Sequence, residues 1–305
     1  MMTRRHLLFG GIGLCCAGAA RLFEPERRFS RAGIAFGTTV RLTLVAASEA
    51  RAEAALDAGF EAMRAVERAA SLFDPASELA LLNRDGRIER PSADLARLVE
   101  AAVTMAEASG GAFDPSVQPL WRLKADAAAT GTAPEAARIA AARALVDWRA
   151  IEVAPERIGF ARPGMAITLN GIAQGHAADR VMAALAAHGI EAALVDTGEF
   201  GGRGRPWRIG LRDPADHGRH LDNVTLEDGF LATSADDETV FDRAAGEHHI
   251  IDPATGHSPR GVHQISVMAA SGLIADGLST ALMVVPAPAR QRLAQRFGAT
   301  IVSVA

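Results

Sequence analysis

The sequence predicts an α+β fold in a single compact unit, and three observations support this prediction. Apolar residues make up 49% of the 305 residues, which is enough for one large hydrophobic core. Strand and helix patterns follow each other too irregularly for a doubly wound parallel sheet. The sequence contains no stretch typical of an interdomain linker and no short-period repeat. We therefore expect one domain, which covers residues 30–305.

The first half of this domain is predicted to be mainly helical. Residues 40–44 alternate in polarity like a half-buried strand, and Ser48 then caps a helix with apolar side chains at helical spacing. Ser92 caps another helix, which Gly110 ends. Asp74, Ser77 and Glu78 are interpreted as a helix-capping turn rather than as catalytic groups. The expected segments are a strand at 40–44, a helix from Ser48 to about Phe73, a helix from Ser92 to Gly110 and an alanine-rich helix at 130–145.

The second half is predicted to be richer in strands. Short apolar and β-branched runs bounded by turn residues are typical of strands. Two helical segments lie among them, one closed by Gly189 and the other by Pro286. The expected strands are residues 151–153, 167–169, 192–195, 207–211, 248–251 and 264–269, and the expected helices are residues 175–188 and 274–285.

The N-terminus has the pattern of a targeting segment. Arg4 and Arg5 precede a modest apolar run, which is too short to span a bilayer, and small residues before Ala19 fit a cleavage site. We expect residues 1–19 to be a twin-arginine signal peptide, which sends the folded protein to the periplasm. The alternative is a chance arginine pair in an ordinary secretory signal.

Composition excludes several classes of function. The net charge of −4 and the 5% aromatic content, with no tyrosine, argue against nucleic-acid binding. Cys15 and Cys16 are adjacent and lie in the signal, so the mature chain has no disulfide, catalytic thiol or zinc-thiolate site. A lipoprotein anchor at Cys16 is not expected, because Gly13 stands where a bulky apolar residue is wanted.

Two motifs, about a hundred residues apart, point to chemistry on a diphosphate. Residues 168–179 read TLNGIAQGHAAD, a glycine-rich bend that enters a helix, whose N-terminal N–H groups can face an anion. Asp276 and Thr280 lie one helical turn apart and offer hard oxygen ligands for a cation such as Mg²⁺. The alternative is that Asp276 caps its own helix and Thr280 bonds back to its own turn.

Segments in the same order along nearly the whole mature chain resemble the ApbE family, the FAD:protein FMN transferases. They are FGTTVRLTL, SLFDPASELALLN, GGAFDPSVQPLW, TLNGIAQGHAADRV, VDTGEFGG, WRIGLRDP, LATSADDE, HHIIDPATG and DGLSTAL. The resemblance implies an exported, magnesium-dependent enzyme that takes FAD as substrate, releases AMP and joins FMN by a phosphoester bond to a Thr or Ser of a target flavoprotein. VDTGEFGG and NGIAQGHAADR are similar to the NosX-like branch associated with nitrous oxide reductase maturation, which implies a NosR-like membrane protein as the target.

The resemblance also implies particular site residues. Its metal site matches Asp276 and Thr280, with backbone carbonyls at Gly171 and Ser279. Its flavin contacts match Phe36, Phe73, Ala112, Phe113, Asp114, Thr168, Gln174 and Ile250. Taken alone, each aromatic is a core residue as readily as a flavin contact, and Asp114 equally suits a turn. The chain departs from the family at three positions. Thr168 stands where the family has Asp, Gln174 where it has Lys or Glu, and His176 where it has Tyr. Contacts that the family makes through a charged side chain at the positions of Thr168 and Gln174 are therefore not carried over.

His249 is the candidate general base, since imidazole titrates near neutral pH and can take the proton of an acceptor hydroxyl. The alternative is a structural histidine at a strand end, whose ring nitrogens are hydrogen-bonded within the protein. Alternation along a strand puts His248 and His249 on opposite faces, so only one of them enters the site. The family's HxIDP pattern selects His249.

Two other functions remain open from the sequence. A FAD pyrophosphatase would use the same site with water in place of the protein acceptor. A non-catalytic periplasmic flavin-binding protein would keep the flavin contacts without the chemistry. Intact Asp276 and Thr280 favour an enzyme.

Overall fold

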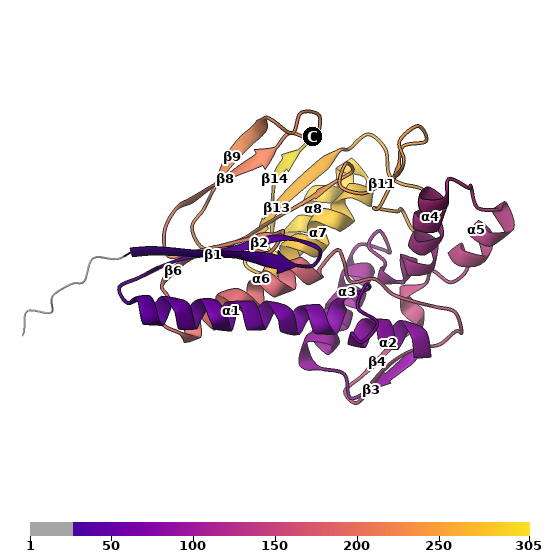
Figure 1. Ribbon diagram of the computed structural model, residues 1–305. Coiled ribbons are helices and arrows are strands. Elements are labelled where there is room, and N and C mark those ends of the chain that lie inside the picture. The colour runs from indigo at the N-terminus through magenta and orange to yellow at the C-terminus, as the bar shows by residue number, and fades with distance from the viewer. Residues whose placement is uncertain (1–26) are drawn as a thin grey trace, which may run out of the picture.

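A seven-stranded antiparallel sheet forms the centre of the molecule (Figure 1). The computed structural model describes residues 27–305, so the predicted signal peptide at 1–19 lies outside the described residues. The strand order is β1-β2-β6-β7-β10-β13-β14, and every neighbouring pair is antiparallel. The strands are β1 (Arg27–Ala35), β2 (Thr38–Ala46), β6 (Ala192–Asp196), β7 (Phe200–Arg203), β10 (Gly229–Ala235), β13 (Gln264–Ala269) and β14 (Thr300–Val304).

The two faces of this sheet are covered differently. In β10, Phe230 and Ala232 join the main core with the helices, whereas Leu231 joins a smaller core with Ile209 and Leu226. Successive side chains of a strand point to opposite faces of the sheet, so β10 is buried on both faces. The helices are α1 (Glu49–Ala70), α6 (Ala173–Ala187) and α7 (Gly272–Val284), with α8 (Ala287–Arg296) before β14, and the hairpin on the other face is β8 (Trp207–Arg212) and β9 (His220–Leu226).

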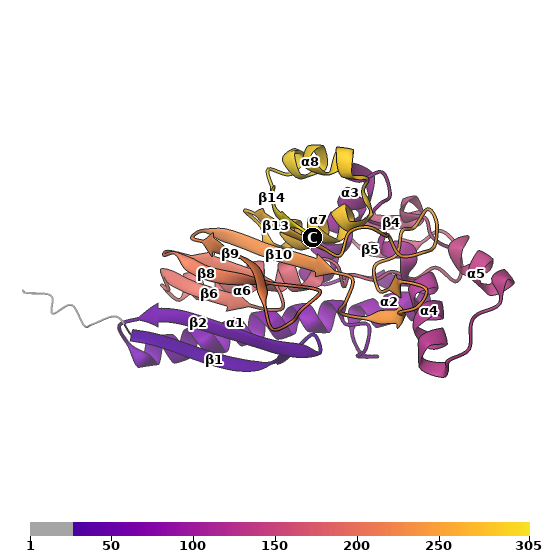
Figure 2. The ribbon, with the colours of Figure 1, turned by 90° about the horizontal axis from the view of Figure 1, so that it is seen from above.

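The remaining elements lie together at one end of the main sheet, as both views show (Figures 1 and 2). A three-stranded sheet of order β3-β5-β4 and a short hairpin accompany four helices there. These elements are α2 (Glu78–Asp85), β3 (Arg87–Glu89), α3 (Ala93–Ala108), α4 (Gln118–Thr130), α5 (Ala136–Arg143), β4 (Ile151–Ala154), β5 (Arg157–Phe160), β11 (Val240–Asp242), β12 (Glu247–His248) and the 3-10 turns Pro115–Val117 and Trp148–Ala150. The mixed architecture confirms the α+β prediction.

The predicted helix starts are confirmed by their caps. Ser48, Ser77 and Ser92 accept hydrogen bonds from backbone N–H groups in the first turns of α1, α2 and α3. Gly189 and Pro286 follow α6 and α7 closely, as expected. No helix within residues 27–305 is long and apolar enough to cross a membrane.

Three sequence predictions are wrong. Residues 167–169 form no strand, because the Asn83 side chain occupies both the N–H and the carbonyl of Ile167, at 2.7 and 2.8 Å. The strand expected at 248–251 ends at His248. The helix expected at 130–145 is interrupted at Gly131, which has φ +66° and ends α4, and α5 begins only at Ala136.

Candidate active site

The two predicted motifs meet where α6 packs against α7. A Cβ at Gly175 would lie only 2.1 Å from the Gly272 carbonyl oxygen, so this close crossing requires glycine. The crossing brings the backbone N–H of Gly175 within 2.8 Å of Oδ2 of Asp276. Asp276 is 3% exposed. Gly175 therefore allows the close contact between α6 and α7, in addition to its place in the glycine-rich bend.

Asp276 does not cap its own helix. The carboxylate of Asp179, on α6, accepts hydrogen bonds from the backbone N–H groups of Gly272 and Leu273 and from the Ser271 hydroxyl, at 2.7 to 3.0 Å. This side chain satisfies the start of α7. The carboxylate of Asp276 is thus free for another role, and the capping alternative is wrong.

Hydroxyl groups surround the next turn of α7. The Ser234 hydroxyl lies 2.8 Å from the Ser279 hydroxyl and 3.1 Å from the Thr280 hydroxyl. Thr280 therefore bonds to β10 rather than to its own turn. A Cβ at Gly171 would lie 3.0 Å from the Thr280 hydroxyl oxygen and 3.2 Å from the Phe113 ring, so these three residues are in contact. The structure brings the predicted metal residues together.

The N-terminus of α6 is less open to an anion than the sequence suggested. The Ala173 N–H donates to the Leu169 carbonyl and the His176 N–H to the Ile172 carbonyl. The Gly175 N–H is occupied by Asp276. The side chain of His176 points away to α3, where Nε2 lies 2.9 Å from Asp94. The expected cradle of free N–H groups for a phosphate is therefore mostly filled by the protein itself.

Sequence reasoning missed a second buried carboxylate at this junction. Glu199, between β6 and β7, is 8% exposed and accepts a hydrogen bond from the Thr233 N–H at 3.0 Å. Burial raises the pKa of Asp276 to about 7. Burial and the charge of Asp276 raise the pKa of Glu199 well above its usual range. The only sequence signal for Glu199 was its place in VDTGEFGG.

The oxygen atoms at the junction fit a hard cation. Within residues 27–305, no group of three or more His, Cys, Asp or Glu side chains is arranged to hold a metal. A cation here would therefore combine the Asp276 carboxylate with neutral oxygens, such as the Thr280 hydroxyl. None of the described backbone hydrogen bonds of loops and caps ends on the Gly171 carbonyl. Such a set of oxygen donors, with positions left for substrate phosphates, suits Mg²⁺.

The predicted flavin residues before α4 lie against this junction. Phe113 is buried in the main core, with Ala112 packed against it. Asp114 accepts hydrogen bonds from the Ser116 N–H and hydroxyl and from the Trp148 N–H, so it caps the turn at Pro115–Val117. Burial raises the pKa of Asp114. Its observed contacts are those of a turn acid.

Thr168 and Gln174 flank the glycine-rich bend. The Thr168 N–H donates to the Pro115 carbonyl at 2.8 Å, which ties the bend to the turn after Asp114. The Gln174 side chain lies over Gly198, where a Cβ would be 2.3 Å from its amide nitrogen. Both side chains are half-buried. The bend thus connects the turn before α4 with the turn between β6 and β7.

Phe36 and Phe73 lie apart from the junction, at the C-terminal end of α1. Phe36 has φ +53°, and its N–H donates to Oε1 of Glu67 in the last turns of α1. Phe73 follows α1 and is 81% exposed, so it is not a core residue. No described hydrogen bond links these two aromatics to Asp276 or Thr280.

His248 and His249 form a partly buried pair. Their ring centroids are 6.1 Å apart, and Nδ1 of each ring is buried without a hydrogen-bond partner among the described residues. Burial, assisted by the neighbouring His248, lowers the pKa of His249 to about 4, so its ring is neutral at neutral pH. Since β12 ends at His248, strand alternation does not separate the two rings. Ile250, which follows, is buried.

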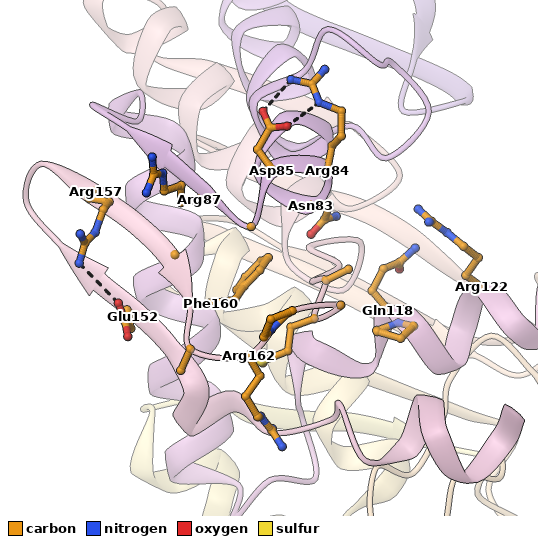
Figure 3. A pocket seen from close by; sticks show the side chains of 18 of the residues that line it. Asn83, Arg84, Asp85, Arg87, Gln118, Arg122, Glu152, Arg157, Phe160 and Arg162 are labelled. Carbon is orange, nitrogen blue, oxygen red and sulfur yellow. Dashed lines mark hydrogen bonds and ion pairs between the residues drawn. The ribbon is translucent and has the colours of Figure 1, made fainter. Parts of the chain in front are cut away.

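A separate cleft of the described chain lies elsewhere. Its volume is about 1150 Å³, and it opens between α2, α4 and the small sheet (Figure 3). Five arginines are among its lining residues, of which Arg84 pairs with Asp85 and Arg157 with Glu152 (Figure 3). None of the predicted flavin or metal residues lines this cleft.

Comparison with known proteins connects this site to a family. The profile of the ApbE family matches residues 36–302. A FAD:protein FMN transferase of Treponema pallidum is 33% identical over 304 residues, which cover 90% of this chain and 82% of that protein. A FAD:protein FMN transferase of Rhodobacter capsulatus is 32% identical, over 94% of this chain and 57% of that protein.

Solved structures show the same fold. The flavin transferase ApbE of Vibrio cholerae gives a TM-score of 0.79 at 25% identity, over 91% of this chain and 93% of that one. The apo form of the flavinyl transferase ApbE of Pseudomonas stutzeri gives 0.78 at 28% identity, over 90% and 91%. Sequence and fold agree along almost the whole described chain, which is therefore an enzyme of the ApbE family.

Proposed function

We propose that this enzyme transfers FMN from FAD to a Thr or Ser hydroxyl of a target flavoprotein and releases AMP. Its relatives named FAD:protein FMN transferase support the flavin transfer. The observation that carries the chemistry is the meeting of Asp276, Thr280 and Gly171 where α6 crosses α7. This meeting gathers charged and neutral oxygen atoms from segments about a hundred residues apart.

These oxygens would hold the Mg²⁺ ion that the resemblance implies. Asp276 supplies a charged ligand, Thr280 a hydroxyl, and Gly171 and Ser279 backbone carbonyls. When bound, the ion neutralises charge on the diphosphate and on the departing AMP. The Asp276 carboxylate accepts a hydrogen bond from the Gly175 N–H, and this bond fixes its orientation.

His249 would act as the general base. The acceptor hydroxyl oxygen attacks the phosphorus of the FMN half, and the bond from that phosphorus to the bridging oxygen breaks, so that AMP leaves with this oxygen. The hydroxyl proton passes to Nε2 of His249, since Nδ1 is buried. The lowered pKa keeps this ring unprotonated and able to accept the proton at neutral pH.

Aromatic and polar residues at the junction and at the C-terminal end of α1 would bind the flavin nucleotide. Phe73 is exposed and free to stack on a ring, and Phe36 lies at the same end of α1. The remaining candidates are Ala112, Phe113, Asp114, Thr168, Gln174 and Ile250. Phe113 supports the proposal best, because its ring touches Gly171.

The proposal extends to where the enzyme works. Residues 1–19 would direct it to the periplasm by the twin-arginine route. The acceptor would be a flavoprotein reached on that side of the membrane, such as a NosR-like membrane protein. The similarity of VDTGEFGG to the NosX-like branch supports this acceptor.

A single assay separates transfer from the two alternatives. The enzyme is mixed with FAD, Mg²⁺ and a candidate acceptor, and AMP release and acceptor mass are followed together. Transfer gives one AMP for each acceptor that gains FMN. AMP without acceptor labelling would identify a FAD pyrophosphatase, and bound FAD without AMP a flavin-binding protein.

Metal variants test the mechanism in the same assay. Asp276→Ala should abolish both products, because it removes the charged ligand of the proposed site. Thr280→Ala should be milder, since a neutral hydroxyl contributes less to a hard cation than a carboxylate does. A parent enzyme that turns over fully in chelator would overturn the metal mechanism.

A further inference from the structure

Glu199 lies in the turn between β6 and β7, which is anchored to the N-terminus of α6, and the charge of Asp276 acts on its carboxyl group. The Thr197 hydroxyl donates to the Gln174 carbonyl at 2.9 Å, which pins the turn between β6 and β7 to the N-terminus of α6. Gly198 has φ +98° and lies under the Gln174 side chain, so the turn cannot carry a larger residue there. This anchoring keeps the neighbouring Glu199 buried at 8% exposure.

One peptide unit connects the anchor of Glu199 with Asp276. The carbonyl of Gln174 accepts from Thr197, and the N–H of the same peptide, that of Gly175, donates to Asp276. A second connection runs through β10. Thr233 donates to Glu199, and the next residue, Ser234, contacts the hydroxyls of Ser279 and Thr280 on α7.

The two carboxylates lack a positive partner in the described protein. Neither Glu199 nor Asp276 takes part in any ion pair within residues 27–305. Each accepts a single hydrogen bond, through Oε2 of Glu199 and Oδ2 of Asp276, so one oxygen of each is left for another ligand. Two buried carboxylates that repel each other are costly unless a cation lies between them.

We propose that Glu199 is a second carboxylate ligand of the cation held by Asp276. Two carboxylates and neutral oxygens form a ligand set that a hard divalent ion accepts, and two negative charges balance its own. The inference rests on the proposed function, because it adds a residue to the same metal site.

Direct binding of Mn²⁺ tests the proposal without FAD or turnover. Free Mn²⁺ is measured by electron paramagnetic resonance during titration of the full chain, with Mg²⁺ as competitor. Glu199→Gln keeps the shape and the acceptor for the Thr233 N–H, and we expect it to weaken binding about 10-fold or more. Glu238→Gln is the control, since Glu238 is exposed and raises the pKa of Asp276 only through its charge. This control should change affinity by at most about threefold.

Thermal unfolding distinguishes a ligand from a structural residue. In chelator at pH 8, Glu199→Gln should unfold at the same or a higher temperature than the parent, because one of two repelling charges is removed. Added Mg²⁺ should then raise its unfolding temperature less than that of the parent. A variant that is less stable in chelator and binds Mn²⁺ like the parent would overturn the proposal.

Asp276→Asn distinguishes a failure of the proposed Glu199 ligand from a failure of the proposed metal site. Loss of Mn²⁺ binding in Asp276→Asn together with unchanged binding in Glu199→Gln would refute the role of Glu199 and leave the proposed metal site intact. Unchanged binding in both variants would refute the metal site itself. Loss in both, with the Glu238→Gln control unaffected, is the expected result.

Discussion

The contact between Gly175 and Gly272 predicts that one added methyl group will disturb the active site. A Cβ at position 175 would lie 2.1 Å from the Gly272 carbonyl oxygen and 2.6 Å from Cβ of Asp276. Neither atom is the end of a flexible side chain. The helices α6 and α7 must therefore separate by about 1.3 Å before the methyl group reaches an ordinary contact of 3.4 Å.

The cost of Gly175→Ala follows from this separation. Overpacking typically costs about 1–3 kcal/mol, and backbone atoms that cannot turn aside favour the upper end. The higher helix propensity of Ala returns about 1 kcal/mol. The net loss of about 2 kcal/mol lowers the unfolding temperature by about 4–8 °C in a domain of this size. A displacement of Asp276 by about 1 Å should also lower AMP release about 100-fold.

Gly277→Ala, on α7, is the matched control. A Cβ there would lie 2.9 Å from Cγ2 of Ile172 and 3.1 Å from the terminal methyl of Met105, so it would meet side-chain atoms and no backbone atom. Thermal unfolding and AMP release are measured for the parent and both variants. We expect the control to stay within about 3 °C of the parent. Equal unfolding temperatures for the two variants, or full activity in Gly175→Ala, would refute this reasoning.

Three further predictions concern the histidines and the N-terminus. His249→Ala should slow FMN transfer by about 100-fold or more with little change in FAD affinity, whereas His248→Ala should do much less; wild-type transfer by His249→Ala would show that His249 is not the base. Because the pKa of His249 is lowered from 6.5 to about 4, its stabilising effect is complete above pH 6.5 and is lost as the pH falls towards 4. Between pH 6.5 and 4, the free energy of unfolding measured in urea should fall by about 3 kcal/mol less in His249→Gln than in the parent. The same pH dependence in both proteins would contradict the burial argument. Replacing Arg4 and Arg5 with Lys should retain the precursor in the cytoplasm, and continued appearance in the periplasm would indicate the general secretory route.

Local signals predicted the elements whose causes are local. The caps at Ser48 and Ser92 were predicted because a serine before an apolar helical pattern acts within its own turn. The segment at 167–169 failed for the opposite reason. Its backbone partner is the side chain of Asn83, 84 positions away, and no pattern within the segment reports that contact. The helix α4 escaped prediction because its N-cap residue, Val117, makes no side-chain cap.

The same distinction holds within the candidate site. Asp276 and Thr280 could be selected from the sequence because they lie one helical turn apart, and Gly171 because the resemblance to the family implies it. Glu199 could not, since its burial depends on the Thr197 hydroxyl reaching the N-terminus of α6 from a neighbouring strand turn. A carboxylate gains its chemistry from the groups that desolvate it, and those groups are set by the fold.

The occupied N-terminus of α6 makes the demand for a cation stronger. A helix N-terminus usually offers N–H groups to a phosphate, but here Asp276 takes the Gly175 N–H and carbonyls take those of Ala173 and His176. The junction instead holds the buried carboxylates of Asp276 and Glu199. Anion and carboxylates repel each other unless a divalent ion joins them. The site should consequently bind its diphosphate substrate more tightly when the cation is present.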